Sequence, residues 1–368
     1  MDMAKAISVS KTIEQMVTHG EHPSSGFIVK ETKFGSIESS PPLGPFPVID
    51  MSLFSSQEHV GTELEKLKSS LSSAGCFQVV GHGMSDSFLD RVREVAVEFF
   101  QLPAEEKQKH ARAVNEIEGY GSDLVVSDAQ VFDWCHRLFL RVFPVHRRRL
   151  NLWPQHPPEF REFLNLDVTV ISEIILINFY SEILNEYAMK LTTVTEVLSK
   201  AIAKSLNLEE YSFLNQFGDQ ALMQVRFNFY PPCSRPDLVH GVKPHTDRSG
   251  ITILLQDREV EGLQIRVDGK WYRVPVIPHA LVVNLGDQMQ IMTNGIYKSP
   301  MHRVVTNTEK LRISIAAFTE PEPENEIGPV DQLIDEQRPK LYRNVRNYGA
   351  INYECYQKGL VALDTVRA

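Results

Sequence analysis

The sequence predicts an α+β protein, in which helices of the N-terminal half precede an antiparallel barrel or double-sheet jelly roll. Two observations support this fold class. Apolar residues recur at helical spacing before residue 205, whereas short β-rich segments alternate with turn signals from about residue 221 to 319. Many short antiparallel strands within about a hundred residues are typical of a barrel or a jelly roll.

The chain has 368 residues, enough for two domains or for one large domain with helical additions. Its 42% hydrophobic and 23% charged residues are ordinary for a globular protein with a buried core. We divide it into four segments: an N-terminal extension (1–45), a helical and mixed region (46–215), the jelly-roll core (216–325) and a closing helix (326–368), the last marked by Tyr342, Tyr348, Tyr353 and Tyr356.

The first regular elements follow a stiff proline-rich connector at 41–47. The spacing predicts a helix with Val60, Leu64, Leu67 and Leu71 on one face, a strand at 76–80, and a helix with Phe88, Val92, Val95 and Phe99 on one side. Gly81 and Gly83 between the last two indicate a tight turn. A dinucleotide fingerprint is disfavoured because Asp86 stands where its third glycine would be.

Net charge and composition exclude several classes of protein. A net charge of −9 argues against a nucleic-acid partner, and the basic run 146–149 is expected to be a solvated loop. The four cysteines are widely separated and form no zinc or redox motif. No signal peptide or apolar membrane span is visible, so we expect a cytoplasmic protein with no membrane partner, and a monomer.

A metal-binding pattern lies in the β-rich part. Residues i and i+2 of a strand face the same side, so His245 and Asp247 could face one ion while Thr246 points away. His302 begins another predicted strand and could supply the third ligand. Two imidazoles and one carboxylate on one face of an ion leave three positions open, the arrangement of non-haem Fe(II) oxygenases. By itself, however, a His-x-Asp pair is more often a surface pair, and His240 and His279 are expected not to be ligands.

An arginine strengthens the metal hypothesis. Arg312 and Ser314 share a strand face, while Ile313 and Ile315 would pack on the other side. A guanidinium beside a hydroxyl makes a good fork for a carboxylate. A structural ion pair is the simpler alternative. We prefer the carboxylate site because the spacing predicts that this strand lies next to the metal strand.

A polar strand face points to the same cavity. In residues 223–230 apolar side chains alternate with Gln224, Arg226, Asn228 and Tyr230. A polar face on a barrel strand indicates that it lines a wet cavity. Asn228 and Tyr230 would then face a second carboxylate.

Together these residues resemble the plant soluble 2-oxoglutarate- and Fe(II)-dependent dioxygenases. The resemblance covers roughly residues 45–360, and its finer texture is similar to the branch with alkaloid and flavonoid O-demethylases and senescence-related oxygenases. The matching stretches are 77–80 with His82-Gly83, 228–233, 245–247, 249–257, 284–287, 302–304 and 312–314.

The resemblance implies a double-stranded β-helix core with an N-terminal helical layer. It implies that His245, Asp247 and His302 hold Fe(II), that Arg312 and Ser314 bind the distal carboxylate of 2-oxoglutarate, and that Tyr230 and Asn228 help hold its metal-bound end. O2 would be consumed, with ascorbate as a supporting reductant. The implied reaction releases succinate and CO2 and oxidises a substrate C–H bond; at an O-methyl carbon the product would collapse to formaldehyde and a free hydroxyl.

The small-molecule substrate is less determined by the sequence. By resemblance, the region from Tyr120 to Phe139 borders its pocket, with Phe132, Trp134, Met301 and Phe318 as further candidates. Their aromatic character favours a flat, apolar specialised metabolite such as a flavonoid, an alkaloid or a terpenoid.

One segment departs from the family pattern. Residues 166–183 are β-branched and apolar where the family runs from one helix into the next, and Glu162-Phe163-Leu164-Asn165 is echoed by Glu182-Ile183-Leu184-Asn185. Removing about twenty residues would join the flanking helices smoothly. Our hypothesis is an insertion, such as a retained intron.

Two other functions stay open at this stage. The chain could be a catalytically inactive jelly roll that binds a ligand, or a related iron oxidase that does not use 2-oxoglutarate. Intact iron ligands together with Arg312 and Ser314 favour the oxygenase over both.

Overall fold

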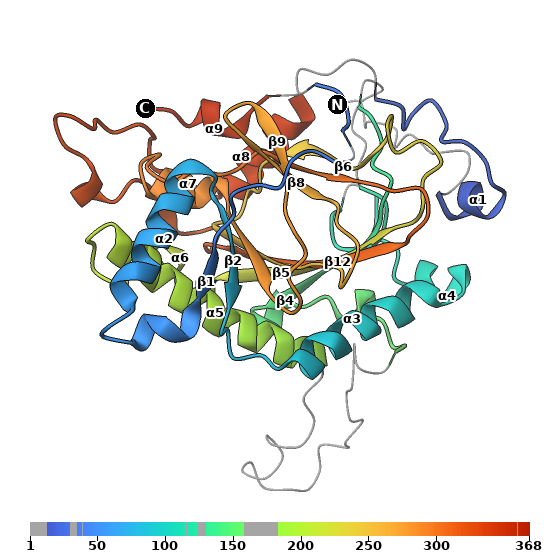
Figure 1. The fold of residues 1–368 in the computed structure, drawn as a ribbon, viewed down its shortest axis with the longest axis horizontal. Coiled ribbons are helices and arrows are strands. Elements are labelled where there is room, and N and C mark those ends of the chain that lie inside the picture. Colours follow the sequence, from blue (N-terminus) through green and yellow to red (C-terminus); the bar gives the residue numbers. More distant parts are fainter. Residues whose placement is uncertain are drawn as a thin grey trace, which may run out of the picture.

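The computed structural model describes residues 13–29, 35–38, 40–114, 116–123, 130–157, 183–358 and 360–368. Two sheets face each other and enclose the interior, and helices cover the outer side of the larger one (Figure 1). This arrangement is a jelly-roll α+β fold, as the sequence predicted. The hypothesis of an insertion concerns residues that lie, up to 182, outside the described part of the chain.

The large sheet has eight strands in the order β1-β2-β10-β7-β12-β5-β4-β3. Only the pair β1–β2 is parallel; its other pairings are antiparallel. The strands are β1 (Val48–Asp50), β2 (Cys76–Val80), β3 (Gly119–Gly121), β4 (His136–Phe143), β5 (Leu222–Tyr230), β7 (Ile251–Leu255), β10 (Leu281–Leu285) and β12 (Arg312–Glu320).

The small sheet has four strands in the order β6-β11-β8-β9. They are β6 (His240–His245), β8 (Leu263–Val267), β9 (Lys270–Arg273) and β11 (His302–Val305). An Asp-Gly hairpin joins β8 to β9, and both of its residues have the positive φ that this turn requires, 47° at Asp268 and 80° at Gly269. A third pair, β13 (Glu326–Ile327) with β14 (Val345–Arg346), follows the core.

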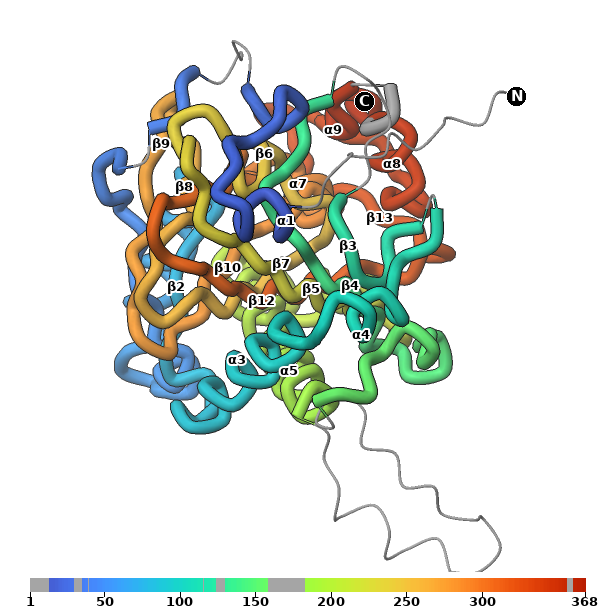
Figure 2. Tube along the Cα trace, turned by 90° about the vertical axis from the view of Figure 1, so that its right-hand side faces the viewer, coloured from blue at the N-terminus to red at the C-terminus, as the bar shows by residue number. Residues whose placement is uncertain are grey.

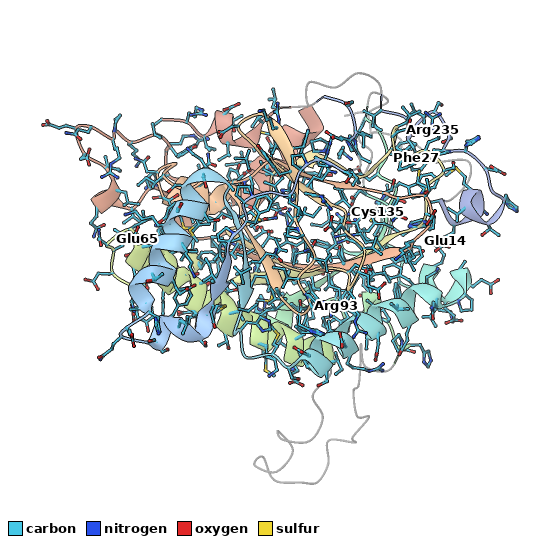
Figure 3. All side chains as sticks on the ribbon, in the orientation of Figure 1. Glu14, Phe27, Glu65, Arg93, Cys135 and Arg235 are labelled. Carbon is cyan, nitrogen blue, oxygen red and sulfur yellow. The ribbon has the colours of Figure 1, made fainter. Side chains whose placement is uncertain are left out.

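Helices α2 (Val60–Ser73), α3 (Asp86–Gln101) and α5 (Ile183–Ser205) run along the outer face of the large sheet (Figures 1 and 2). Their predicted apolar faces are buried in one core with the outward side chains of the sheet. Ser85 caps α3 by accepting a hydrogen bond from the Phe88 N–H over 3.3 Å. Arg93 on α3, labelled in Figure 3, donates to the carbonyl of Gln256 over 3.0 Å and ties the helix to the barrel.

The other helices of the described chain are shorter. They are α1 (Ile13–Thr18), α4 (Ala104–Gln108), α6 (Leu214–Phe217), α7 (Asp287–Met292), α8 (Tyr348–Lys358) and α9 (Ala362–Thr365), with short 3-10 turns at 51–55, 145–147, 150–152 and 331–333. The predicted closing helix is therefore α8, and Tyr342 precedes it. Among the described residues, no helix is long and apolar enough to cross a membrane.

Strands from the N-terminal region extend the large sheet at both edges. β1 and β2 flank β10, and β4 and β3 flank β5. The sheet thus runs across the predicted division at residue 215, which stays a prediction about sequence segments.

The prediction of a solvated loop at 146–149 is wrong for Arg148. Its Nε donates to the carbonyl of Val142 over 2.8 Å, its Nη2 donates to Asn185 Oδ1 over 2.7 Å, and its guanidinium lies 4.9 Å from the ring centre of Trp153. A planar guanidinium can stack and donate at once, so the residue fastens the end of β4 to the start of α5.

Candidate metal centre and the pocket beside it

Two neighbouring strands of the small sheet bring the three predicted metal ligands together. β6 and β11 are antiparallel, and His302 is the direct partner of His245. Asp247 follows two residues after His245, just past the end of β6. The expectation that both lie within one strand therefore holds for His245, while Asp247 reaches the same place from the first turn after it.

The ligand atoms converge on one point. Asp247 Oδ1 lies 3.7 Å from His245 Nε2 and 3.6 Å from His302 Nε2, and the three ligand atoms lie within 4.8 Å of one another. Among the described residues this is the one group of three or more His, Cys, Asp or Glu side chains with such geometry. Its spacing leaves room for an ion at ordinary ligand distances.

Backbone contacts orient both imidazoles. His245 Nδ1 donates to the Lys243 carbonyl over 2.8 Å, and His302 Nδ1 donates to the Pro300 carbonyl over 3.0 Å. Each bond fixes the proton on Nδ1, because a carbonyl oxygen only accepts, and so leaves Nε2 as a free lone pair. Burial, helped by the neighbouring His302, lowers the pKa of His245 to about 4, so its ring is neutral at pH 7.

The backbone of the third candidate ligand is also held. The backbone carbonyl of Asp247 accepts a hydrogen bond from the Asp287 N–H over 2.8 Å. Asp247 Oδ2 is buried without a hydrogen-bond partner in the protein. A buried carboxylate oxygen without a partner is costly unless a cation meets it. Two imidazoles, one carboxylate and an open side fit a non-haem Fe(II) ion.

Arg312 presents a guanidinium inside the barrel. It is 1% exposed, its Nε donates to the Val260 carbonyl over 3.1 Å, and its Nη1 lies 3.5 Å from Ser314 Oγ. Its Nη2 is buried without a partner. Gly262 makes room for this side chain, since a Cβ there would come within 2.9 Å of the Arg312 side chain. The unused N–H groups beside a hydroxyl could hold a carboxylate.

The prediction that Arg312 lies on a strand next to the metal strand is wrong. Its strand is not next to the metal strand: β12 lies in the large sheet between β7 and β5, whereas β11 lies in the small sheet. In a jelly roll successive strands cross from one sheet to the other. Arg312 therefore faces the metal ligands across the interior.

Asn228 and Tyr230 lie beside Arg312 on the neighbouring strand. In the pairing of β5 with β12, Asn228 is opposite Ser314 and Tyr230 is opposite Arg312. Asn228 Nδ2 lies 3.4 Å from Ser314 Oγ, and the Arg312 guanidinium lies 5.1 Å from the centre of the Tyr230 ring. Burial raises the pKa of the Tyr230 hydroxyl, so it stays protonated and can donate. The four predicted co-substrate residues thus form one group.

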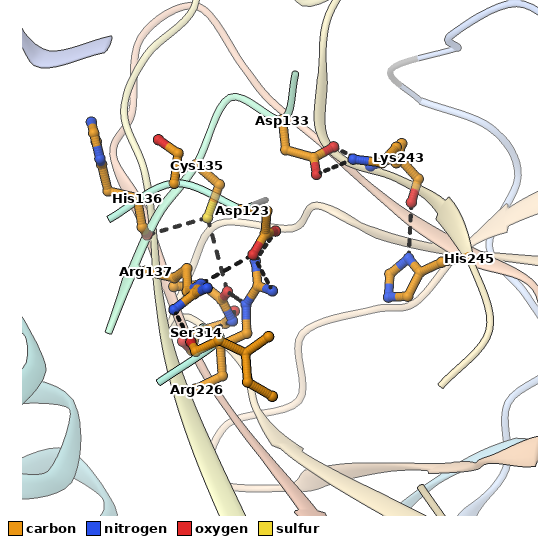
Figure 4. A network of polar contacts seen from close by, with 12 residues as sticks. Asp123, Asp133, Cys135, His136, Arg137, Arg226, Lys243, His245 and Ser314 are labelled. Carbon is orange, nitrogen blue, oxygen red and sulfur yellow. Dashed lines mark hydrogen bonds and ion pairs between the residues drawn. The ribbon is translucent and has the colours of Figure 1, made fainter. Parts of the chain in front are cut away.

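A pocket of about 260 Å³ opens at the metal ligands. Its wall combines two metal ligands, a few apolar groups and many charged ones. The lining residues are Ile117, Asp123, Asp133, Arg137, Phe139, Gln224, Arg226, Val242, Lys243, His245, Thr246, Asp247, Arg248, Phe318, Glu320, Asn352 and Tyr353. Figure 4 shows the charged part of this wall, with Asp123 held between arginines and Lys243 beside His245.

Of the five predicted substrate contacts, Phe318 lines this pocket, where its ring centre is 6.0 Å from that of Phe139. The structure does not bring the other four to the described wall. Tyr120 stacks on His136 in the main core, Trp134 and Phe132 pack against Phe27 under the N-terminal segment, and Met301 precedes β11.

The predicted border region from Tyr120 to Phe139 does line the pocket, but sequence reasoning did not single out its acidic residues, Asp123 and Asp133. Asp123 Oδ1 and Oδ2 accept from Arg226 over 3.1 and 2.8 Å, and Asp133 accepts from Lys243 Nζ over 2.7 Å. The polar face of β5 could have signalled them, because a buried Arg226 requires a counter-charge.

Comparison with known families gives two matches. Residues 220–321 match the family described as 2OG-Fe(II) oxygenase superfamily, and residues 46–156 match the one described as non-haem dioxygenase in morphine synthesis N-terminal. The first match contains the candidate metal ligands and Arg312.

Several plant proteins are similar over most of the chain. Protein SRG1 of Arabidopsis thaliana is 38% identical, over 81% of this chain and 78% of its own length. Codeine O-demethylase of Papaver somniferum is 38% identical, over 82% and 78%. Oxoglutarate-dependent flavonoid 7-O-demethylase 1 of Ocimum basilicum is 33% identical, over 94% and 88%.

Solved structures share the fold. The crystal structure of JOX2 in complex with 2OG, Fe and JA superposes with a TM-score of 0.83 at 29% identity, covering 98% of each chain. A rice dioxygenase for auxin oxidation gives a TM-score of 0.71 at 24% identity, covering 88% of this chain and all of its own, and so supports the fold alone.

Proposed function

This chain belongs to the 2OG-Fe(II) oxygenase superfamily, and we propose that within it the protein oxidises a C–H bond of an aromatic or polycyclic plant specialised metabolite, by hydroxylation or O-demethylation. It is an oxidoreductase that uses Fe(II) and 2-oxoglutarate and acts on small molecules. The flavonoid and alkaloid demethylases among its relatives support the narrower substrate class.

We assign the residues of the site as follows. His245, Asp247 and His302 hold Fe(II), which supplies the activation of O2 when bound. Arg312 and Ser314 bind the distal carboxylate of 2-oxoglutarate, where the buried Arg312 Nη2 has no partner in the protein. Asn228 and the protonated Tyr230 lie beside these two residues and help to hold the co-substrate.

The overall reaction balances without a further reactant. The substrate C–H, O2 and 2-oxoglutarate give substrate C–OH, succinate and CO2. If the carbon is an O-methyl group, the hydroxymethyl ether breaks its C–O bond to release formaldehyde and leaves a hydroxyl on the substrate. The protein's own part is to bind and orient both molecules and to keep water away from the reacting carbon.

One observation carries the proposal: the pocket that contains His245 and Asp247 also has an aromatic wall, with Phe139 and Phe318. Aromatic and apolar walls recognise flat substrates. The fold makes the pocket continuous with the metal centre, so a ring placed against these two residues presents its substituents near the iron.

The test is a screen of methoxylated flavonoids, alkaloids and terpenoids with the iron-loaded protein, 2-oxoglutarate and ascorbate. We expect at least one compound to release succinate and formaldehyde, or a hydroxylated product, in equal amounts. Turnover without succinate would instead indicate an iron oxidase that does not use 2-oxoglutarate. Tight substrate binding without any product would indicate an inactive binding protein.

We further propose that the protein acts as a monomer in the cytoplasm. Size-exclusion chromatography with light scattering and a fluorescent fusion test these two points. A stable dimer, or a fusion found in an organelle, would overturn the respective proposal.

A further inference from the structure

We infer that the carboxylate of Asp123 occupies the hydrogen-bonding edge of the Arg226 guanidinium in this pocket. As a result, the pocket selects uncharged substrates and excludes carboxylic acids. The inference rests on the proposed function, because it names the charge class of the substrate at the same site. It makes Asp123 a specificity-determining residue.

The carboxylate of Asp123 accepts hydrogen bonds from two arginines at once. Both of its oxygens accept from Arg226, over 3.1 Å from Nη1 and 2.8 Å from Nη2, and Oδ1 also accepts from Arg137 Nε over 3.0 Å (Figure 4). The side chains are 23% exposed for Asp123, 16% for Arg226 and 3% for Arg137. The bidentate fork of Arg226, which would recognise a substrate carboxylate, is thus occupied by the protein itself.

Two further donors of these arginines are also engaged. Arg226 Nε donates to Asn228 Oδ1, and Arg137 Nη1 donates to the carbonyl of Gly119 over 2.9 Å. Burial by itself would raise the pKa of the Asp123 carboxyl, but the charges of Arg226 and Arg137 outweigh it and hold that pKa well below its usual range. Asp123 is therefore a permanent anion in this pocket at any ordinary pH.

The other cations of the wall are matched in the same way. Lys243 Nζ donates to Asp133 over 2.7 Å, and Arg248 Nε donates to Glu320 over 3.0 Å. Among the described lining residues, every lysine or arginine has a carboxylate partner on the same wall. The described part of the wall therefore offers an ionised substrate no cation that lacks a carboxylate partner.

An entering carboxylate would meet two costs. It would be desolvated beside Asp123, Asp133 and Glu320 without gaining a free cation, and like charges at close range repel. An uncharged aromatic compound meets neither cost, because it needs only the space between Phe139 and Phe318. Arg137, held by Asp123 with its guanidinium 5.6 Å from the centre of the Phe139 ring, helps to fix that aromatic surface.

The experiment compares matched acids and methyl esters. Dissociation constants are measured without O2, by tryptophan fluorescence, on the protein loaded with Fe(II) and saturating 2-oxoglutarate. The probes are 4-methoxycinnamic acid, 3,4-dimethoxycinnamic acid and 4-methoxybenzoic acid, each beside its methyl ester. We expect the wild type to bind the esters at least about tenfold more tightly than the acids. Acids that bind as well as the esters, or esters that do not bind at all, would overturn the inference.

The variant Asp123→Asn keeps the shape and removes the charge. It should shift the acid-to-ester ratio toward the acids by about tenfold or more, because the Arg226 fork becomes available. The double variant D123N/R226Q should return toward ester preference. An unchanged ratio in folded D123N would show that Asp123 only supports the structure; if D123N does not fold, the wild-type ratio and the double variant decide the question.

A matched control is Asp237→Asn. Asp237 also holds an arginine with both oxygens, Arg235 over 2.9 and 2.7 Å, but on the exposed surface away from the pocket. It should leave the ratio unchanged. Succinate formation is measured separately: a wild type that never forms succinate refutes the proposed function, whereas an altered or absent charge preference with normal succinate refutes only this inference.

Discussion

Two arginine-bearing regions of the interior differ in one respect. Arg312 on β12 and Arg226 on β5 lie on adjacent strands of the large sheet, four residue pairs apart along the pairing that also aligns Ser314 with Asn228. Arg312 keeps a buried Nη2 without a partner, whereas Asp123 covers both terminal nitrogens of Arg226. The first region is open to a diacid, and the second is closed to one.

The difference teaches that an arginine in a cavity does not by itself indicate an anion site. What matters is whether the protein already supplies the carboxylate. An unsatisfied buried donor costs about 1–3 kcal/mol, so a fold keeps one where a ligand will meet it. Asn228 connects the two regions, because it accepts from Arg226 and donates to Ser314.

The largest effect on the comparison is expected when the candidate metal centre is removed. Asp247→Ala should lose Fe(II) binding and reduce succinate formation by more than about 100-fold, because the one charged ligand is gone. Iron content and succinate yield measure it. His240→Gln is the control, since His240 lies on the same strand but outside the ligand group; loss of iron there as well would argue against the assigned ligands.

Substitution of Arg312, whose Nη2 has no partner in the protein, should affect the binding of 2-oxoglutarate. Arg312→Gln should weaken 2-oxoglutarate binding by about 10- to 100-fold while iron still binds, because a charge-assisted pair is lost. Arg312→Lys should recover only part of it, since an ammonium lacks the fork. Titration calorimetry under nitrogen measures both. If Arg226→Gln weakened 2-oxoglutarate binding as strongly, the distinction between the two regions would fail.

For Arg226, which is already paired with Asp123, we expect an effect on stability instead. Asp123→Asn should lower the free energy of unfolding by about 1–3 kcal/mol, because it leaves Arg226 and Arg137 without their counter-charge. Asp237→Asn on the surface should cost less than about 0.5 kcal/mol. Chemical denaturation of the two variants measures the contrast.

The pH dependence follows from the lowered pKa of Asp123. A carboxyl whose pKa is lower in the folded state stabilises the fold above its unfolded pKa, roughly 4, and this contribution is lost as the pH falls below that value. Wild type should therefore lose stability below pH ~4 more steeply than D123N. Parallel acid curves would contradict the role of Asp123 as the counter-ion.

The smallest effect is expected where the two regions meet. Asn228→Ala should weaken both 2-oxoglutarate and substrate binding by about 2- to 10-fold, since one modest hydrogen bond is lost on each side. The two dissociation constants are measured on the same preparation. A change confined to one ligand would mean that the regions are independent.

The sequence predicted most of the metal site because that site is local. His245 and Asp247 are two residues apart, Arg312 and Ser314 likewise, and the alternation of β5 marked Asn228 and Tyr230 as inward. The helices at 60–73 and 86–101 followed from their apolar spacing in the same way.

The remainder depends on contacts between distant segments. Asp123 meets Arg226 about a hundred residues later, and no periodicity encodes such a pair. Which sheet β12 joins is decided by how the strands of the jelly roll cross from one sheet to the other. Sequence spacing alone therefore predicted that Arg312 lies beside the metal strand, whereas Arg312 lies on the opposite sheet. Tyr120 and Trp134 are aromatic like pocket residues but are buried in packing clusters, which composition cannot distinguish.

The position of Arg312 opposite the iron ligands has a mechanical consequence. The large and small sheets share no strand pairing among the described residues. In the proposed arrangement 2-oxoglutarate would act as a strut, attached to one sheet through the ion and to the other through the guanidinium. Binding of the co-substrate would therefore hold the two sheets at a fixed separation.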